Sequence, residues 1–284
     1  MEMENYKDNL IKYFSSLIEL ETGIQYDETN KYLLLTRIQS LLKLININSI
    51  DSLWNEIQTK GLNSETKSLI LDLATNNETS FFRDPKVFEF FKTEFVPKIM
   101  ANKNRIRIWC AATSTGQEPY SIAIIMAELK EQGINKNYEI LATDISDRVL
   151  KQAEKGLYTQ LEVQRGLSPE HLRKYFNEEL SDTSLVPSYK VKSEISSFIT
   201  YKQLNLLHPW PNFEPFDIIF CRNVLIYQSL ENKKNVISKF AKLLNPEGYL
   251  ILGGAESLLQ LSNDYDLINF NNITVHKLKT EIKN

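Results

Sequence analysis

The sequence is poor in the residues that build disulfide frameworks and metal centres, with two cysteines and three histidines among 284 residues. Cys110 and Cys221 lie in separate apolar runs, each without a second cysteine nearby, and the histidines are scattered. This spacing predicts neither a disulfide nor a metal site. It is typical of a protein from a reducing compartment.

Long hydrophobic runs and a leader segment are also missing. No apolar run approaches the roughly 20 residues that a membrane-spanning helix needs. The first residues, MEMENYKDNL, have neither the basic start nor the apolar core of a signal peptide. We therefore expect a cytoplasmic protein that does not insert directly into a membrane.

An excess of positive charge is absent as well. The formal net charge is −3 and no dense cluster of Lys and Arg stands out, so the sequence predicts no binding to nucleic acid. The 42% of hydrophobic residues are typical of an ordinary globular protein. A chain of this length fits one medium domain plus a small one.

The first part of the sequence has helical periodicity. From residue 5 to about 75, apolar residues recur at intervals of three and four, in the runs 10–17, 34–45 and 50–57. Gly23 and Gly61 fall between these runs, where a helix would end. The pattern predicts a small all-α domain.

After residue 84 helices and strands alternate. Asp84 and Pro85 are typical of an N-cap followed by the first residue of a helix. Buried strands are predicted at 105–112, 138–144, 216–223 and 249–254, and helices at 119–130 and 231–244. This alternation indicates an α/β fold with an open, mostly parallel sheet that is covered on both faces.

One segment does not follow this alternation. Residues 186–206 have the pattern of two strands with no helix between them. We expect them to form a small antiparallel unit at the edge of the sheet.

Polar residues follow three of the predicted strands, at the edge where open α/β sheets bind ligands. After the first strand, AATSTGQE is a loop of small residues that would let a ligand approach backbone amides, although it has one Gly where the dinucleotide fingerprint has three. Asp144 is suited to accept hydrogen bonds from the hydroxyls of a ribose, and Arg222 and Asn223 would need partners or a ligand. A tight turn, a helix N-cap and an ion pair, respectively, are the alternative explanations.

Five stretches, in this order and spacing, resemble the chemotaxis receptor methyltransferases of the CheR type: NNETSFFRDP, WCAATSTGQEPYSIA, LATDIS, NLL and FCRNVLIY. Enzymes of this family transfer a methyl group from S-adenosylmethionine (SAM) to glutamate side chains of chemoreceptors and produce S-adenosylhomocysteine. The resemblance runs from the helical part nearly to the C-terminus.

The resemblance implies a class I SAM-dependent methyltransferase fold, Rossmann-like, preceded by an all-α N-terminal domain. The implied boundaries are 1–75 for the helical domain, 76–90 for a linker that contributes to the SAM site, and 91–284 for the methyltransferase domain. A small antiparallel β-subdomain would occupy about 186–204.

The resemblance also implies roles for particular residues. Arg83 and Tyr227 would lie closest to the transferred methyl group and are the candidate catalytic residues. Asp144 would bind the ribose, while Asn205 and Leu206 would flank the adenine. The implied cofactor-binding set is Asn77, Thr79, Arg83, Glu118, Asp144, Asn205, Leu206, Arg222 and Asn223.

The stretch NNETSFFRDP joins the helical part to the α/β part. Two adjacent Phe side chains cannot both face one core stripe. This indicates a linker segment with two separate roles. By the resemblance, Asn77, Thr79 and Arg83 would face the ligand, while Phe81 and Phe82 would anchor the linker to the domains.

The implied reaction needs little acid–base chemistry. A glutamate side chain, with a pKa of about 4.3, is already an anion at neutral pH. The task that remains is to align oxygen, methyl and sulfur for in-line displacement. Arg83 could position the incoming carboxylate by a charge-assisted hydrogen bond, and the Tyr227 hydroxyl could orient the same group.

Three features depart from the family pattern. No Gly occurs between Gly166 and Gly248, whereas relatives that dock on a receptor tail peptide use a glycine-containing loop in the β-subdomain. We therefore expect the protein to bind the methylation helices of chemoreceptors without tail-peptide docking. The stretch GGAES at 253–257 lacks a His that is often found there in the family. The predicted second helix has few basic residues: Lys31, Arg37 and Lys43.

Two other functions remain compatible with the sequence. One is a SAM-dependent methyltransferase that acts on another carboxylate or a small molecule, and the other is a SAM-binding regulatory module without turnover. The intact set of candidate residues argues against the regulatory module. Only the identity of the methyl acceptor separates the first alternative from the chemoreceptor enzyme.

Overall fold

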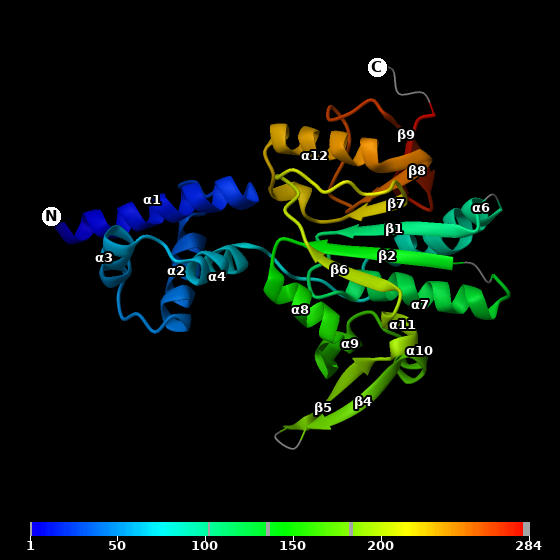
Figure 1. Ribbon diagram of the computed structural model, residues 1–284, viewed down its shortest axis with the longest axis horizontal. Coiled ribbons are helices and arrows are strands. Elements are labelled where there is room, and N and C mark those ends of the chain that lie inside the picture. Colours follow the sequence, from blue (N-terminus) through cyan, green and yellow to red (C-terminus); the bar gives the residue numbers. More distant parts are fainter. Residues whose placement is uncertain (1, 102, 135–136, 182–183, 281–284) are drawn as a thin grey trace. The chain divides into compact units, whose positions relative to one another are not determined.

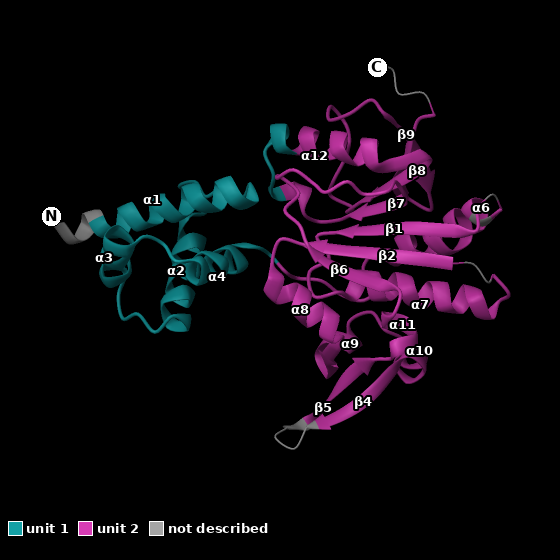
Figure 2. Cartoon of the chain, viewed as in Figure 1, with its two compact units in different colours: residues 1–76, 227–232 teal, residues 77–226, 233–284 magenta. Residues whose placement is uncertain are grey.

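The computed structural model describes residues 2–101, 103–134, 137–181 and 184–280 (Figure 1). These residues divide into two compact units (Figure 2). Unit 1 contains the residues up to Asn76 together with the segment Tyr227–Asn232, and unit 2 contains Asn77–Ile226 and the residues from Lys233 onward. Among the described helices, none combines the length and apolar composition that a bilayer-spanning segment requires.

Unit 1 is a helical bundle, as the periodicity predicts. Its helices are α1 (Glu2–Thr22), α2 (Lys31–Leu44), α3 (Ile50–Lys60) and α4 (Ser64–Ala74). The side chains of Ser49 and Asn63 cap α3 and α4 by accepting hydrogen bonds from backbone amides. The helices enclose a core whose fully buried members include Leu10, Phe14, Ile18, Leu34, Ile38, Leu41 and Ile70.

The segment Tyr227–Asn232 belongs to unit 1 although it is distant from the helices in sequence. Gln228 Nε2 donates a hydrogen bond to the Thr22 carbonyl at 2.7 Å. Gly23 has a φ of 73°, and a Cβ at this position would lie 1.9 Å from Gln228 Oε1. Glycine is therefore needed at this position both for the backbone conformation and for the approach of Gln228.

Unit 2 is built on a mostly parallel sheet. The described residues form a seven-stranded sheet in the order β6-β2-β1-β7-β8-β10-β9 and a three-stranded sheet in the order β3-β5-β4 (Figure 1). Strands β6, β2, β1, β7 and β8 run parallel, and β10 pairs antiparallel with β8 and β9. The strands of the larger sheet are β1 (Arg105–Ala111), β2 (Asn137–Asp144), β6 (Ile199–Gln203), β7 (Phe216–Cys221), β8 (Leu244–Leu252), β9 (Tyr265–Phe270) and β10 (Ile273–Leu278).

Helices cover both faces of this sheet. Ile108 and Cys110 of β1 belong to one core with the helical segments 85–95 and 117–131. Trp109 points to the other face, since successive side chains alternate along a strand, and its ring packs 5.2 Å from that of Phe240. The helical elements that lie wholly in unit 2 are α5 (Pro85–Phe90), the π-helical η1 (Phe91–Phe95), α6 (Val96–Met100), α7 (Gln117–Glu131), α8 (Asp147–Lys155), α9 (Gln160–Gln164), α10 (Pro169–Tyr175) and α11 (Ser193–Ser196). The 3-10 turn η2 (Leu225–Tyr227) follows β7, and α12 (Leu230–Leu243) continues from unit 1 into unit 2.

The small antiparallel sheet begins earlier in the sequence than predicted. It consists of β3 (Leu157–Thr159), β4 (Phe176–Ser181) and β5 (Ser184–Val191). The prediction that 186–206 forms two antiparallel strands with no helix between them is wrong. Helix α11 follows β5, and β6 then pairs in parallel with β2 in the larger sheet. Alternation along a short run indicates a strand but does not identify its partner. The pattern therefore cannot distinguish an antiparallel pair from a strand that joins the larger sheet.

Candidate functional site

The carboxyl ends of β1, β2 and β7 lie side by side, as the strand pattern predicts. The parallel register pairs Ala111 of β1 with Thr143 of β2 on one side and with Cys221 of β7 on the other. The polar stretches that follow these three strands therefore begin at one edge of the sheet (Figure 1).

Asp144 ends β2 and is only 6% exposed. Its Oδ2 accepts a hydrogen bond from the Ser114 amide at 2.8 Å, and its Oδ1 accepts one from the Ser146 amide at 3.0 Å. The N-cap of α8 is Ser146, whose hydroxyl accepts from the Val149 amide. Asp144 is thus not the capping residue, and its carboxylate instead fixes the loop that follows β1.

The loop after β1 is tightly folded. The Thr113 amide donates to the Thr143 carbonyl at 2.8 Å, and the Ser114 hydroxyl donates to the Asn77 carbonyl at 2.7 Å. Gly116, which precedes α7, has a φ of 94°, and a Cβ there would lie 2.8 Å from that of Ala153. The single glycine of this loop is therefore required by close packing against α8.

An ion-pair network around the buried Arg222 connects α7, the loop after β7 and the linker. The Arg222 side chain is 3% exposed, and its Nη1 donates to Glu118 Oε2 at 3.0 Å. Its Nη2 donates to the Arg83 carbonyl at 2.8 Å and also pairs with the Asp84 carboxylate. Burial raises the pKa of Glu118, and the neighbouring Arg222 charge opposes this shift. Asp84 does precede α5, but it makes no capping hydrogen bond, because its carboxylate pairs with Arg222.

The linker is anchored by both phenylalanines within unit 2. Phe81 is 1% exposed, and its ring packs edge-on against Tyr158 at 5.0 Å. Phe82 stacks on His171 at 5.0 Å, and its amide donates to the Ser121 hydroxyl at 2.9 Å. Two adjacent aromatic side chains thus hold the linker on two different surfaces.

Thr79 and Arg83 are half-buried in this linker, and Arg83 Nη1 donates to the Glu78 carbonyl at 3.2 Å.

The loop that carries Asn205 and Leu206 is held next to Asp144. The Leu204 amide donates to the Asp144 carbonyl at 2.9 Å, and Asn205 Oδ1 accepts from the Leu207 amide at 2.9 Å.

Lys239 of α12 also holds this loop, which the sequence does not predict. Its ammonium group donates to the carbonyls of Leu206, Leu207 and His208 at 3.1, 3.3 and 3.0 Å. Burial lowers the pKa of Lys239, but nothing in the sequence distinguishes this lysine from its neighbours on the helix.

Tyr227 is the one predicted site residue that belongs to unit 1, and the other nine lie in unit 2. Its hydroxyl accepts a hydrogen bond from Asn76 Nδ2 at 3.0 Å. The sequence prediction did not include Asn76, although it stands directly before Asn77 in the same motif.

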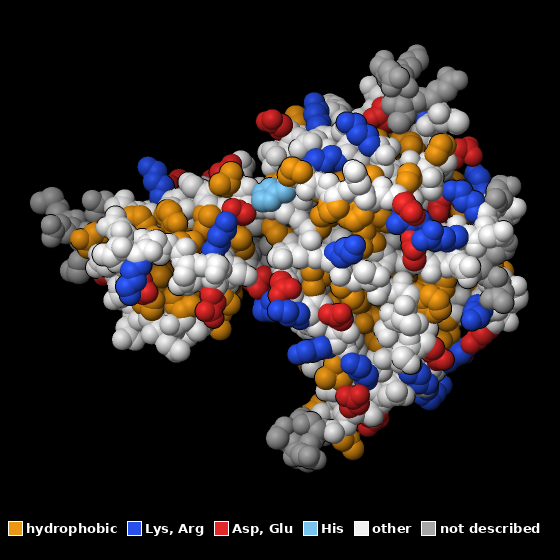
Figure 3. Space-filling model, in the orientation of Figure 1, with side chains coloured by type: hydrophobic (Ala, Val, Ile, Leu, Met, Phe, Trp, Pro, Cys, Tyr) orange, Lys and Arg blue, Asp and Glu red, His pale blue; other side chains and the backbone are white. Residues whose placement is uncertain are grey.

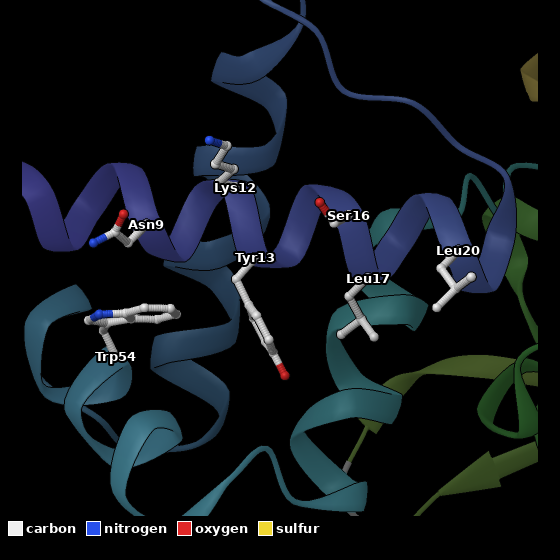
Figure 4. Close-up of a pocket in the computed structure, with 7 residues that line it drawn as sticks. All are labelled: Asn9, Lys12, Tyr13, Ser16, Leu17, Leu20 and Trp54. Carbon is white, nitrogen blue, oxygen red and sulfur yellow. The ribbon is translucent and has the colours of Figure 1, made fainter.

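Unit 1 also contains a pocket of about 500 Å³ between α1 and α3 (Figure 4). The ring of Tyr13 lies edge-on to that of Trp54, with centroids 5.9 Å apart. The pocket lacks the carboxylates that would pair with the hydroxyl and ammonium groups of SAM, since none of its lining residues is acidic. They are Asn9, Lys12, Tyr13, Ser16, Leu17, Leu20 and Trp54.

The strand order of unit 2 and the acidic site at the carboxyl ends of β1 and β2 define a class I SAM-dependent methyltransferase. Residues 77–274 match the family described as "CheR methyltransferase, SAM binding domain", and residues 5–74 match "CheR methyltransferase, all-alpha domain". The chain therefore belongs to the CheR methyltransferases. This confirms the predicted family and fold class.

Individual relatives are similar over nearly the whole chain. The chemotaxis protein methyltransferase of Vibrio parahaemolyticus is 37% identical over 97% of this chain and 97% of that protein. Chemotaxis protein methyltransferase 1 of Vibrio cholerae is 36% identical over the same shares. Chemotaxis protein methyltransferase 1 of Pseudomonas aeruginosa is 35% identical over 94% of this chain and 96% of that protein.

The protein is thus a SAM-dependent methyltransferase of chemotaxis, and the residues of the site fit this cofactor. Two carboxylates, Glu118 and Asp144, stand at the edge of the sheet where a ribose and an ammonium group would need acceptors. Thr113 Oγ1 and Arg222 Nε are buried without a hydrogen-bond partner among the described residues. Buried polar atoms of this kind indicate a site that a polar ligand completes.

Proposed function

We propose that the protein transfers the methyl group of SAM to glutamate side-chain carboxylates on the methylation helices of chemoreceptors, in the cytoplasm. The observation that carries the proposal is the convergence of Glu118, Asp144, Arg222 and the linker at one edge of the sheet in a CheR methyltransferase. The proposal includes neither nucleic acid nor membrane insertion as a partner. In Figure 3, basic and acidic side chains are interspersed over the visible face of the described residues.

We assign the cofactor contacts as follows. Asp144 binds the ribose, Glu118 and Arg222 hold the amino-acid end, and Asn205 and Leu206 flank the adenine. The remaining contacts come from Asn77, Thr79, Arg83 and Asn223. The assignment of Asp144 is supported by its burial and by its place at the carboxyl end of β2, the edge at which open α/β sheets bind ligands.

We also propose that the functional boundaries are residues 1–75 for the helical domain, 76–90 for a linker that contributes to the SAM site, and 91–284 for the methyltransferase domain. The contacts of Phe81 and Phe82 support this role for the linker.

Positioning is the main catalytic task of this site. When bound, SAM supplies an electrophilic methyl group on a positively charged sulfur. Asp144, Glu118 and Arg222 would hold SAM so that its methyl group could pass to a glutamate oxygen, with the electron pair of the broken carbon–sulfur bond left on sulfur. No residue has to remove a proton, because a glutamate with a pKa of about 4.3 is already ionised at neutral pH.

Arg83 and Tyr227 are the residues that we assign to the incoming carboxylate. The guanidinium group of Arg83 donates a charge-assisted hydrogen bond to it. The Tyr227 oxygen accepts from Asn76, so its own proton can be donated to the same carboxylate. Two donors would align the nucleophile with the methyl group, which is the source of rate enhancement that such a site offers.

The acceptor can be identified with labelled SAM and membranes that contain the organism's own chemoreceptors. We expect label on receptor-sized bands, and we expect brief alkali treatment to release it as methanol, because a carboxyl methyl ester is labile to alkali. Alkali-stable label would assign the enzyme to a different acceptor group. Absence of label despite measurable SAM binding would contradict the proposed function and favour a regulatory module.

Replacing Asp144 by Asn should weaken the binding of S-adenosylhomocysteine about tenfold, because the charged acceptor for the ribose hydroxyls becomes a neutral one. Isothermal titration calorimetry on the purified chain measures this directly. The matched control is Asp147→Asn, since Asp147 lies three residues away and its half-exposed carboxylate pairs with Lys151. Equal affinities of Asp144→Asn and wild type would remove Asp144 from the cofactor site.

A peptide that copies the C-terminal tail of a chemoreceptor should show no saturable binding below about 1 mM. The reason is the absence of glycine between Gly166 and Gly248, the segment that contains β4 and β5. Fluorescence polarisation with a labelled peptide is a suitable measurement, and methylation of intact receptor membranes by the same preparation is the control. Saturable binding in the micromolar range would contradict the prediction.

A further inference from the structure

One carboxylate holds the loop that follows β7. Glu256, in the loop after β8, accepts hydrogen bonds from five backbone amides at once. Oε1 accepts from Val224, Leu225 and Ile226 at 3.0, 2.7 and 3.2 Å. Oε2 accepts from Asn223 and Gly253 at 2.8 and 2.7 Å.

These amides need such a partner. Residues 223–226 include the start of the turn η2, and the first amides of a helical turn have no partner within the turn. Asn223 has a φ of 60°, in the left-handed region that few residue types adopt readily. An anionic acceptor compensates for the amide dipoles and holds this conformation more strongly than a neutral acceptor would.

The approach of Glu256 also depends on Gly253. A Cβ on Gly253 would lie 2.8 Å from Glu256 Oε2 and 2.6 Å from Asn223 Nδ2. Strands β7 and β8 are neighbours, with Cys221 paired to Leu252. Glu256 therefore connects the loops that leave two adjacent strands at the edge of the sheet where the cofactor site lies.

We propose that Glu256 is a positioning residue for the methyltransferase site. Its carboxylate fixes the backbone of residues 223–226, and thereby the position of Asn223 and the start of the turn that ends at Tyr227. The inference rests on the proposed function for the roles of Asn223 and Tyr227.

The first test compares Glu256→Gln with wild type. Gln has nearly the same shape, but its amide nitrogen would face at least two of the five amide donors. We expect the dissociation constant for S-adenosylhomocysteine to rise about tenfold or more. We also expect faster hydrogen exchange in the peptides that cover 222–228 and 253–257, with exchange in β1 and β2 unchanged.

The matched control is Glu247→Gln. Glu247 lies on β8, and its half-exposed carboxylate pairs with Lys277, so this variant removes the same charge from the strand that leads into the Glu256 loop. It should bind S-adenosylhomocysteine as the wild type does. Gly253→Ala provides a second variant that leaves Glu256 in place but crowds it, and it should change affinity and exchange in the same direction as Glu256→Gln.

An affinity within twofold of wild type for both Glu256→Gln and Gly253→Ala would overturn the proposal. Weaker binding accompanied by faster exchange throughout β1 and β2 would overturn it too, because Glu256 would then only support the fold. Asn223→Ala separates this proposal from the assigned cofactor contacts. Normal binding by Asn223→Ala, with weak binding by Glu256→Gln, would refute the role of the Asn223 side chain and leave the positioning role of Glu256 in place.

Discussion

Replacing Arg222 by Met should lower the free energy of unfolding of unit 2 by about 3–5 kcal/mol, as the loss of one partner of a buried ion pair does. The Glu118 carboxylate is only 12% exposed and would lose its buried charged partner. The Asp84 carboxylate and the Arg83 carbonyl would lose the same donor.

The measurement should follow unit 2 alone, because a chain with two compact units need not unfold in one step. In a Trp54→Phe background, the remaining tryptophans, Trp109 and Trp210, both lie in unit 2. Urea unfolding followed by tryptophan fluorescence then reports the stability of this unit.

Two further variants make the test specific. Arg105→Met removes a half-exposed partner of Glu139 and should destabilise unit 2 far less than Arg222→Met, because exposed ion pairs contribute little. The double variant Arg222→Met with Glu118→Gln should be less destabilised than the sum of the single changes, because the buried charge is removed together with its partner. A loss of less than about 1 kcal/mol for Arg222→Met alone would contradict the prediction.

Arg83→Ala and Tyr227→Phe should each lower kcat about 100-fold while changing SAM affinity much less. Both groups are assigned to the carboxylate that accepts the methyl group, and misplacing a reacting group by about 1 Å can cost a factor of this size. A larger effect on kcat than on binding is the sign of an interaction made in the transition state.

Turnover on receptor membranes and calorimetric binding of S-adenosylhomocysteine measure the two quantities separately. Lys86→Ala is the matched control, since Lys86 is an exposed basic residue close to Arg83. Wild-type kcat in both Arg83→Ala and Tyr227→Phe would remove these residues from the chemistry.

The elements that the sequence predicts well are those with local signals. The helical stripe of Leu34, Ile38 and Leu41 is fully buried in unit 1. The strand predicted at 105–112 is buried as β1, with Cys110 in one core and Trp109 in the other. The polar residues after β1, β2 and β7 meet at one edge because the strands are parallel, which the alternation of helices and strands already indicates.

The elements that the sequence does not predict depend on distant partners. The sequence FNEELS of β4 has no alternation of apolar residues, so its pairing with β5 cannot be inferred locally. Lys239 and Glu256 bind backbone groups remote from them in sequence. Nothing in their own neighbourhoods distinguishes them from solvated charges.

The hairpin of β9 and β10 is a different case, because its turn does have a local signal in the sequence. Asn271 and Asn272 separate the two strands and have φ values of 43° and 68°, as a two-residue hairpin turn requires.

The lone His276 on β10 is a core residue, 2% exposed, and burial lowers its pKa.

The return of Tyr227–Asn232 to unit 1 limits how the chain can be divided. The backbone passes between the units at three points, near residues 76, 226 and 232, so a single cut does not release either unit as a complete piece. A fragment that begins at residue 77 would keep Tyr227 and Gln228 but lose the Thr22 carbonyl that Gln228 binds. The helical unit is therefore not an exchangeable module, and a chimera of two relatives would have to carry both its N-terminal helices and this internal segment from the same parent.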